Sequence, residues 1–151
     1  MIDSVRWFGV IALALLPAAA PARPAATLGV AELSCSKEIP RSLCVRLTER
    51  LVAALEEQGS HAVVRQSEAR KKQRACREDA ACVARHRTAF DHIVSGTVRP
   101  AESGVEISLR LLDARRMEKL AESSAEAPSV QEKELLAGVD EAARKLLAEK
   151  R

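Results

Sequence analysis

The chain has 151 residues, a formal net charge of +3 and charged side chains at 30% of its positions. Acidic and basic residues are mixed along the chain, which argues against a dedicated nucleic-acid binder. Only 2% of the residues are aromatic, so almost no side chains are available to stack on bases or sugars, and we expect an aliphatic core.

The first 22 residues have the pattern of a secretory signal. Arg6 supplies a positive charge, Trp7 to Leu16 form an apolar run, and small residues follow Pro17. Ala20-Pro21-Ala22 is an Ala-x-Ala site, so we expect cleavage after Ala22, with a cut two residues earlier as the alternative. The run is too short to span about 30 Å of hydrocarbon as an uncleaved anchor, and no cysteine for lipid attachment lies near the cut. The sequence therefore predicts a periplasmic or secreted protein consisting of residues 23–151.

The first half of this mature part predicts strands alternating with helices. Apolar alternation predicts a strand over 27–34, followed by a loop that holds Cys35. The next helix, over 41–58, carries a leucine every four residues and stops at Gly59. A strand over 61–65, a short basic helix over 67–75 and a further helix ending near Arg87 complete this half.

The second half predicts three strands in succession and a final helix. The strands are expected over 89–99, 105–113 and 117–124, and the helix from Pro128 onward. The last strand is weakly apolar, which is typical of a sheet edge. Gly96 is expected to allow close packing rather than to bind phosphate. The predicted fold is one α/β (α+β) domain over 23–151, in which helices pack on a mixed sheet of about five strands.

The four cysteines are Cys35, Cys44, Cys76 and Cys82. An even number in an exported chain predicts disulfides, and of the three possible pairings we expect the local one, Cys35 with Cys44 and Cys76 with Cys82. Residues six apart in one helix lie about 9 Å apart, too far for a bridge, so the second pair needs a bend in the backbone. Zinc is the alternative, but these gaps are longer than those of usual ligand pairs. We expect neither a metal nor a cofactor.

Catalytic motifs are not found in the sequence: it has no nucleophile elbow, no zinc-protease helix motif and no phosphate-binding glycine loop. Asp91 and His92 are adjacent and should point to opposite faces of a strand, so they are not expected to act as a pair. Glu78 and Asp79 are interpreted as helix-start charges. We expect a protein that is not an enzyme.

One segment, from Arg65 to Arg77, is strongly basic. It could contact anionic lipid, lipopolysaccharide or an acidic partner, and the alternative is an ordinary solvated helix face. The candidate contacts are Arg65, Arg70, Lys71, Lys72, Arg74 and Arg77.

The order of elements resembles the small α/β domain shared by the amino-terminal domain of TolB and the CsgG-like family of curli-assembly lipoproteins. The resemblance rests on Leu47 to Gly59, on Val63 to Glu68, on Cys76 to Pro100 and on Ile107 to Leu120, which matches the family's apolar strand, its turn and its return strand. The chain departs from the pattern at Ser34 to Lys37, where relatives have a longer loop. The resemblance implies a fold and an envelope location more than an activity, and pore formation is not supported.

Three hypotheses follow. The preferred one is a non-enzymatic envelope protein, an interaction or assembly module that binds another envelope protein through a sheet edge, for which Met117 to Ser124 is the candidate, or through a helix groove. The second is an anionic-surface binder that uses the basic segment in a peripheral contact with a membrane. The third is a secreted enzyme of unrecognised chemistry, which would need convergent titratable groups in one pocket.

Overall fold

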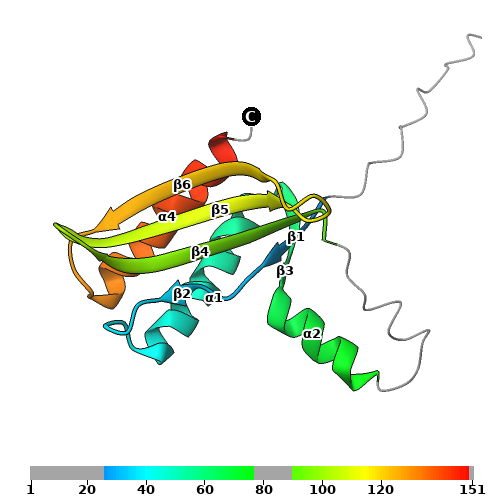
Figure 1. Cartoon of the computed structure of the whole chain (residues 1–151), viewed down its shortest axis with the longest axis horizontal. Helices are drawn as coiled ribbons and strands as arrows, with labels where there is room; N and C mark the ends of the chain where they lie inside the picture. Colours follow the sequence, from blue (N-terminus) through cyan, green and yellow to red (C-terminus); the bar gives the residue numbers. More distant parts are fainter. Residues whose placement is uncertain (1–25, 77–89, 150–151) are drawn as a thin grey trace, which may run out of the picture.

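The computed structural model of the chain describes residues 26–76 and 90–149 (Figure 1). Its elements are β1 (Ala26–Val30), β2 (Ser34–Cys35), α1 (Arg41–Glu57), β3 (His61–Arg65), α2 (Gln66–Ala75), β4 (His92–Ala101), β5 (Gly104–Asp113), β6 (Lys119–Ala127) and α4 (Glu132–Glu149). The predicted class, a mixed sheet with helices packed on it, is confirmed. The helix expected to end near Arg87 lies outside the described residues, as does the signal.

The strands form one six-stranded sheet in the order β3-β1-β4-β5-β6, with β2 also paired to β4. β1 runs parallel to β3 and β4, whereas β4, β5 and β6 are successive antiparallel neighbours. The single strand expected over 27–34 is in fact two, and Cys35 lies in β2 rather than in a loop. The break occurs because Leu33 enters the core and its N–H donates to Thr48 Oγ1, 3.1 Å away, instead of to β4.

Helices α1 and α4 pack against each other on one face of the sheet, behind the strands in Figure 1. The expected leucine stripe of α1 faces the core, because Leu43, Leu47, Leu51 and Leu55 are all buried. The facing strand residues alternate as a half-covered sheet requires, with Ile107, Leu109 and Leu111 fully buried on β5. Helix α2 projects from the end of β3 and does not share this layer.

Two glycines lie where neighbouring elements approach each other closely. A Cβ on Gly96 would lie 2.6 Å from Leu109 Cδ2 and 2.7 Å from the carbonyl oxygen of Ser108. One on Gly138, inside α4, would lie 2.6 Å from Ile107 Cδ1. Gly96 therefore fills the close-packing role expected for it, and Gly138 lets α4 approach β5 despite its low helix propensity.

A disulfide joins Cys35 of β2 to Cys44 of α1, with the two Cα atoms 6.1 Å apart. This is one of the two local pairings expected from the spacing. The other involves Cys82, which lies outside the described residues. The Cys35–Cys44 bridge ties the shortest strand to the helix layer, which compensates for the few backbone hydrogen bonds that a two-residue strand can make.

The last strand and last helix begin later than the sequence indicates. β6 starts at Lys119 rather than Met117, because Met117 has a positive φ of 57° that takes it out of the strand conformation. Likewise, α4 starts at Glu132 rather than Pro128, since β6 continues to Ala127. No helix in the described ranges combines the length and the apolar character needed to cross a membrane.

Candidate functional site

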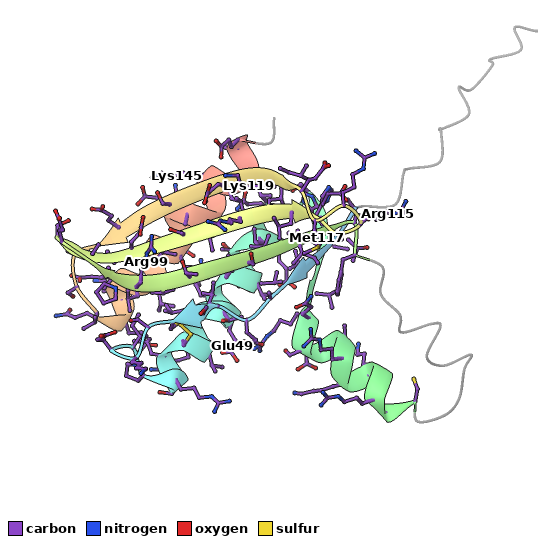
Figure 2. All side chains as sticks on the ribbon, viewed as in Figure 1. Glu49, Arg99, Arg115, Met117, Lys119 and Lys145 are labelled. Atoms are coloured by element: carbon purple, nitrogen blue, oxygen red, sulfur yellow. A yellow bond between two sulfur atoms is a disulfide. The ribbon has the colours of Figure 1, made fainter. Side chains whose placement is uncertain are left out.

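The sheet face opposite α1 and α4 is polar and faces the viewer in Figure 2. It contains a shallow hollow of about 600 Å³ that extends over β2, β4, β5 and β6. Four of its hydroxyl residues form a row in register across the strands: Ser34 is opposite Thr97, Thr97 is opposite Ser108, and Ser108 is opposite Ser124. This row of hydroxyls crosses the sheet at right angles to the strands and offers hydrogen-bonding groups to a ligand.

Charged pairs flank the hydroxyl row on both sides. Arg99 Nη2 lies 2.9 Å from Glu106 Oε2 across β4 and β5. On the other side, the Glu122 carboxylate forms ion pairs with Lys119 Nζ at 2.6 Å and with Arg110 Nε at 3.0 Å. The hydrogen bond from Lys119, and then that from Arg110, lowers the pKa of Glu122 below its ordinary value of 4.5. Glu122 therefore stays ionised at neutral pH, unlike a general acid, whose pKa is raised.

A second hollow, of about 490 Å³, lies where α4 ends near the start of β1. It is lined by Ala26, Gln58, Ser60, His61, Arg144, Leu147 and Ala148. His61 and Arg144 are its titratable groups, and the ring of His61 packs edge-on against His92 at 5.8 Å between centroids. Asp91 is engaged elsewhere, since its carboxylate accepts the N–H of Thr27 at 2.8 Å. Within the residues that the structure describes, no three metal-ligating side chains come together.

The outer edge of the sheet on one side is β6, as expected for the last strand. The backbone of every second residue in an antiparallel edge strand points away from its partner. Here Glu122 and Ser124 point outward: the Glu122 N–H donates to Glu149 Oε2 at 3.3 Å, and the Ser124 carbonyl accepts from Lys145 Nζ at 3.3 Å. Two exposed side chains of α4 thus cover part of this edge with long hydrogen bonds.

The cations of the basic segment differ in their surroundings: Arg65 is paired within the fold, whereas those of α2 face solvent. Arg65 is mostly buried and lies 2.8 Å from Glu32 and 3.6 Å from Glu49, so it holds β3 to its neighbours. The α2 cations Arg70, Lys71, Lys72 and Arg74 are exposed. Lys71 pairs with Glu68 at 3.1 Å, and the other three form no ion pair with any described residue. Arg77 lies outside the described residues.

Comparison with known proteins concerns the fold. No protein-family model and no curated protein matches the sequence. Among solved structures, the PelC dodecamer from Paraburkholderia phytofirmans superposes on 83% of this chain and 91% of its own, with 12% identity and a TM-score of 0.52. The chain shares its fold with a PelC subunit.

Two further structures are similar at lower scores. TolB from Acinetobacter baumannii matches 83% of this chain and 29% of its own, with 13% identity and a TM-score of 0.49. The LpoB C-terminal domain from Escherichia coli matches 70% and 84%, with 12% identity and a TM-score of 0.49. Both scores are below 0.5 and add nothing to the fold assignment. TolB is one of the two families that the sequence was found to resemble. The resemblance to the other, the CsgG-like curli-assembly family, stays a prediction.

Sequence reasoning missed the hydroxyl row because its members are spread between positions 34 and 124. Only the strand register brings them together. A partial signal was present, since Ser108 lies between Glu106 and Arg110 on the solvent side of an alternating strand.

Proposed function

We propose that this chain is an exported, non-enzymatic envelope protein that binds a protein partner by strand addition at the outer edge of β6. The main support for this proposal is that β6, nine residues long from Lys119 to Ala127, lies at the edge of the sheet. An incoming strand needs outward backbone groups, and those of Ser124 and Glu126 lie along this edge. Among the described residues, it would displace the long contacts that Glu149 and Lys145 make to the backbone of this edge.

The chemistry of the edge indicates what kind of strand it accepts. Glu126 is exposed on the open face of β6 and forms no ion pair with any described residue, whereas Glu122 is already paired with Lys119 and Arg110. Opposite charges on neighbouring strands stabilise a pair. We therefore expect a partner strand that carries Lys or Arg. The secretory pattern of residues 1–22 supports export, and the Cys35–Cys44 disulfide suits an oxidising compartment. PelC, which shares the fold, was solved as a dodecamer, so this fold is compatible with assembly.

The test is a proline at the edge. Ser124→Pro removes an N–H that points away from β5, so the β5–β6 pairing should survive while strand addition should fail. Ser124→Ala is the matched control, because it also removes the hydroxyl but keeps the N–H. We expect crosslinking in the native host to capture one envelope protein with the wild type and with Ser124→Ala, and to lose it with Ser124→Pro. Equal capture by all three, with unchanged circular dichroism, would reject the edge as the binding site.

A second candidate function is supported by α2. Its exposed cations Arg70, Lys72 and Arg74 suit an acidic partner or an anionic surface. Replacing Arg70 and Arg74 with Ser should weaken such binding and reduce its salt dependence. The control, Arg41→Ser with Lys133→Ser, removes the same charge from α1 and α4. If both double variants weaken binding equally, net charge rather than α2 is responsible.

A further inference from the structure

The turn between β5 and β6, residues 114–118, lies at the end of the sheet, and together with the first two residues of β6 it is here named the hairpin tip (residues 114–120). Figure 2 shows Arg115 and Met117 at this tip, with Lys119 at the start of β6. Met117 is 60% exposed and Leu120 is 43% exposed. They are two of the four large hydrophobic residues exposed in the described ranges, and they lie three positions apart. Two large exposed apolar side chains so close along the chain, at one end of the sheet, make this tip a candidate interaction site.

The backbone holds this tip in a defined shape. Asp113 Oδ1 accepts the N–H groups of Arg115 and Arg116 at 2.9 and 2.8 Å, and the Asp113 carbonyl accepts the Met117 N–H at 2.8 Å. Met117 is the one non-glycine residue in the described ranges with a positive φ. That conformation costs about 1 kcal/mol for a side chain that buries little of itself in return.

The position of Leu120 is set by an irregularity in the sheet. The β5–β6 register passes from Leu111 opposite Ala121 to Leu112 opposite Lys119. Leu120 is therefore the extra residue of a β-bulge, a feature that redirects side chains next to functional sites.

Cations surround these apolar side chains. Arg115, Arg116 and Lys119 are all exposed. Arg115 has no ion-pair partner within the described ranges, and Arg116 lies 4.0 Å from Glu118. A tip that combines apolar side chains with cations matches the boundary between lipid headgroups and acyl chains, where phosphates lie above hydrocarbon. A protein partner would instead need about 800 Å² of contact, which a projecting turn does not offer alone.

We propose that the hairpin tip docks on an anionic lipid surface, with Met117 and Leu120 entering the headgroup region and Arg115, Arg116 and Lys119 facing lipid phosphates. The site is distinct from the β6 edge proposed for a protein partner and from α2. Lys119 would exchange part of its contact with Glu122 for a phosphate.

Trp7 is the single tryptophan of the chain and lies in the segment that is expected to be removed on export. The mature protein therefore has no tryptophan of its own, and an introduced one reports on its own position. Met117→Trp places a reporter at the tip, and Val130→Trp places one at another exposed apolar position, 52% exposed in the wild type. With vesicles of phosphatidylglycerol and phosphatidylcholine, we expect a blue shift of emission for Met117→Trp and none for Val130→Trp. Pure phosphatidylcholine should give no shift in either. A shift at both positions, or at neither, overturns the proposal.

A second variant separates the contact of the Met117 side chain with lipid from the effect of the strained backbone at this position. Met117→Gly removes the side chain but accepts the positive φ, so the fold should be retained. We expect its affinity for the anionic vesicles to fall about tenfold, the effect of losing one partly buried apolar side chain. Val130→Gly serves as the matched control and should bind as the wild type does. Vesicle binding that survives in Met117→Gly but is lost when Arg70 and Arg74 are replaced would place the lipid contact on α2 and reject the tip.

Discussion

Thr48 shows how much depends on one buried hydroxyl. Its side chain is 1% exposed; Oγ1 accepts the Leu33 N–H and donates to the Cys44 carbonyl, both at 3.1 Å. It thereby stabilises the break between β1 and β2 from the side of α1. The same contact directs Leu33 into the core and leaves the two strands on either side free to pair with β4.

We predict that Thr48→Val lowers the free energy of unfolding by about 1–3 kcal/mol, because Val has the same shape but leaves the Leu33 N–H buried without an acceptor. Thr48→Ser keeps the hydroxyl and should lose less. Urea denaturation of the three proteins in the oxidised state measures both differences. A Thr48→Val protein as stable as the wild type would show that water replaces the lost bond.

Among the elements, β2 depends most on a covalent link. It has two residues and is joined to α1 by the Cys35–Cys44 disulfide. Replacing both cysteines with Ser should lower the free energy of unfolding by about 2–3 kcal/mol, the value for closing a loop of about ten residues. Ser34→Ala, beside the bridge, should change stability by less than about 0.5 kcal/mol. Thermal melts under oxidising conditions provide the comparison, and an unchanged midpoint without the bridge would contradict this role.

Prediction from sequence succeeded for elements whose pattern is local. The leucines of α1 and the alternation of β5 are repeats between near neighbours, so they identify a helix and a strand directly. The ends of β6 were less accurate, because Met117 adopts a conformation that its residue type does not predict. The sequence makes Arg65 a candidate contact to a partner, with a solvated face as the alternative. In the structure it pairs instead with Glu32, in the loop after β1, and with Glu49 of α1.

For the whole molecule, acidic pH should be destabilising. The pKa of Glu122 is lowered by its hydrogen bond from Lys119, that of Glu141 by its hydrogen bond from Lys145, and that of Asp113 by the backbone N–H of Arg116. A carboxyl whose pKa is lower in the folded state adds stability above its unfolded pKa, and this is lost as pH falls through the folded pKa.

We therefore expect a constant melting temperature from pH 7 down to about pH 5, and a progressive fall below the ordinary glutamate value of 4.5. The double variant Glu122→Gln, Glu141→Gln should be less stable at pH 7 and lose less on acidification. Melts followed by circular dichroism measure both trends. An equal acid-induced loss in the variant and the wild type would assign the effect to other carboxyls.

The sequence by itself determined the fold class and the amphipathic helices, because each follows from repeats between residues close along the chain, and it favoured the Cys35–Cys44 pairing among three possible ones. The tertiary structure alone decided the surfaces. The hydroxyl row from Ser34 to Ser124, the exposed edge of β6 and the apolar, basic hairpin tip depend on register, strand order and a bulge. These features arise from pairing between distant segments, and a pattern of near neighbours does not encode which segments meet.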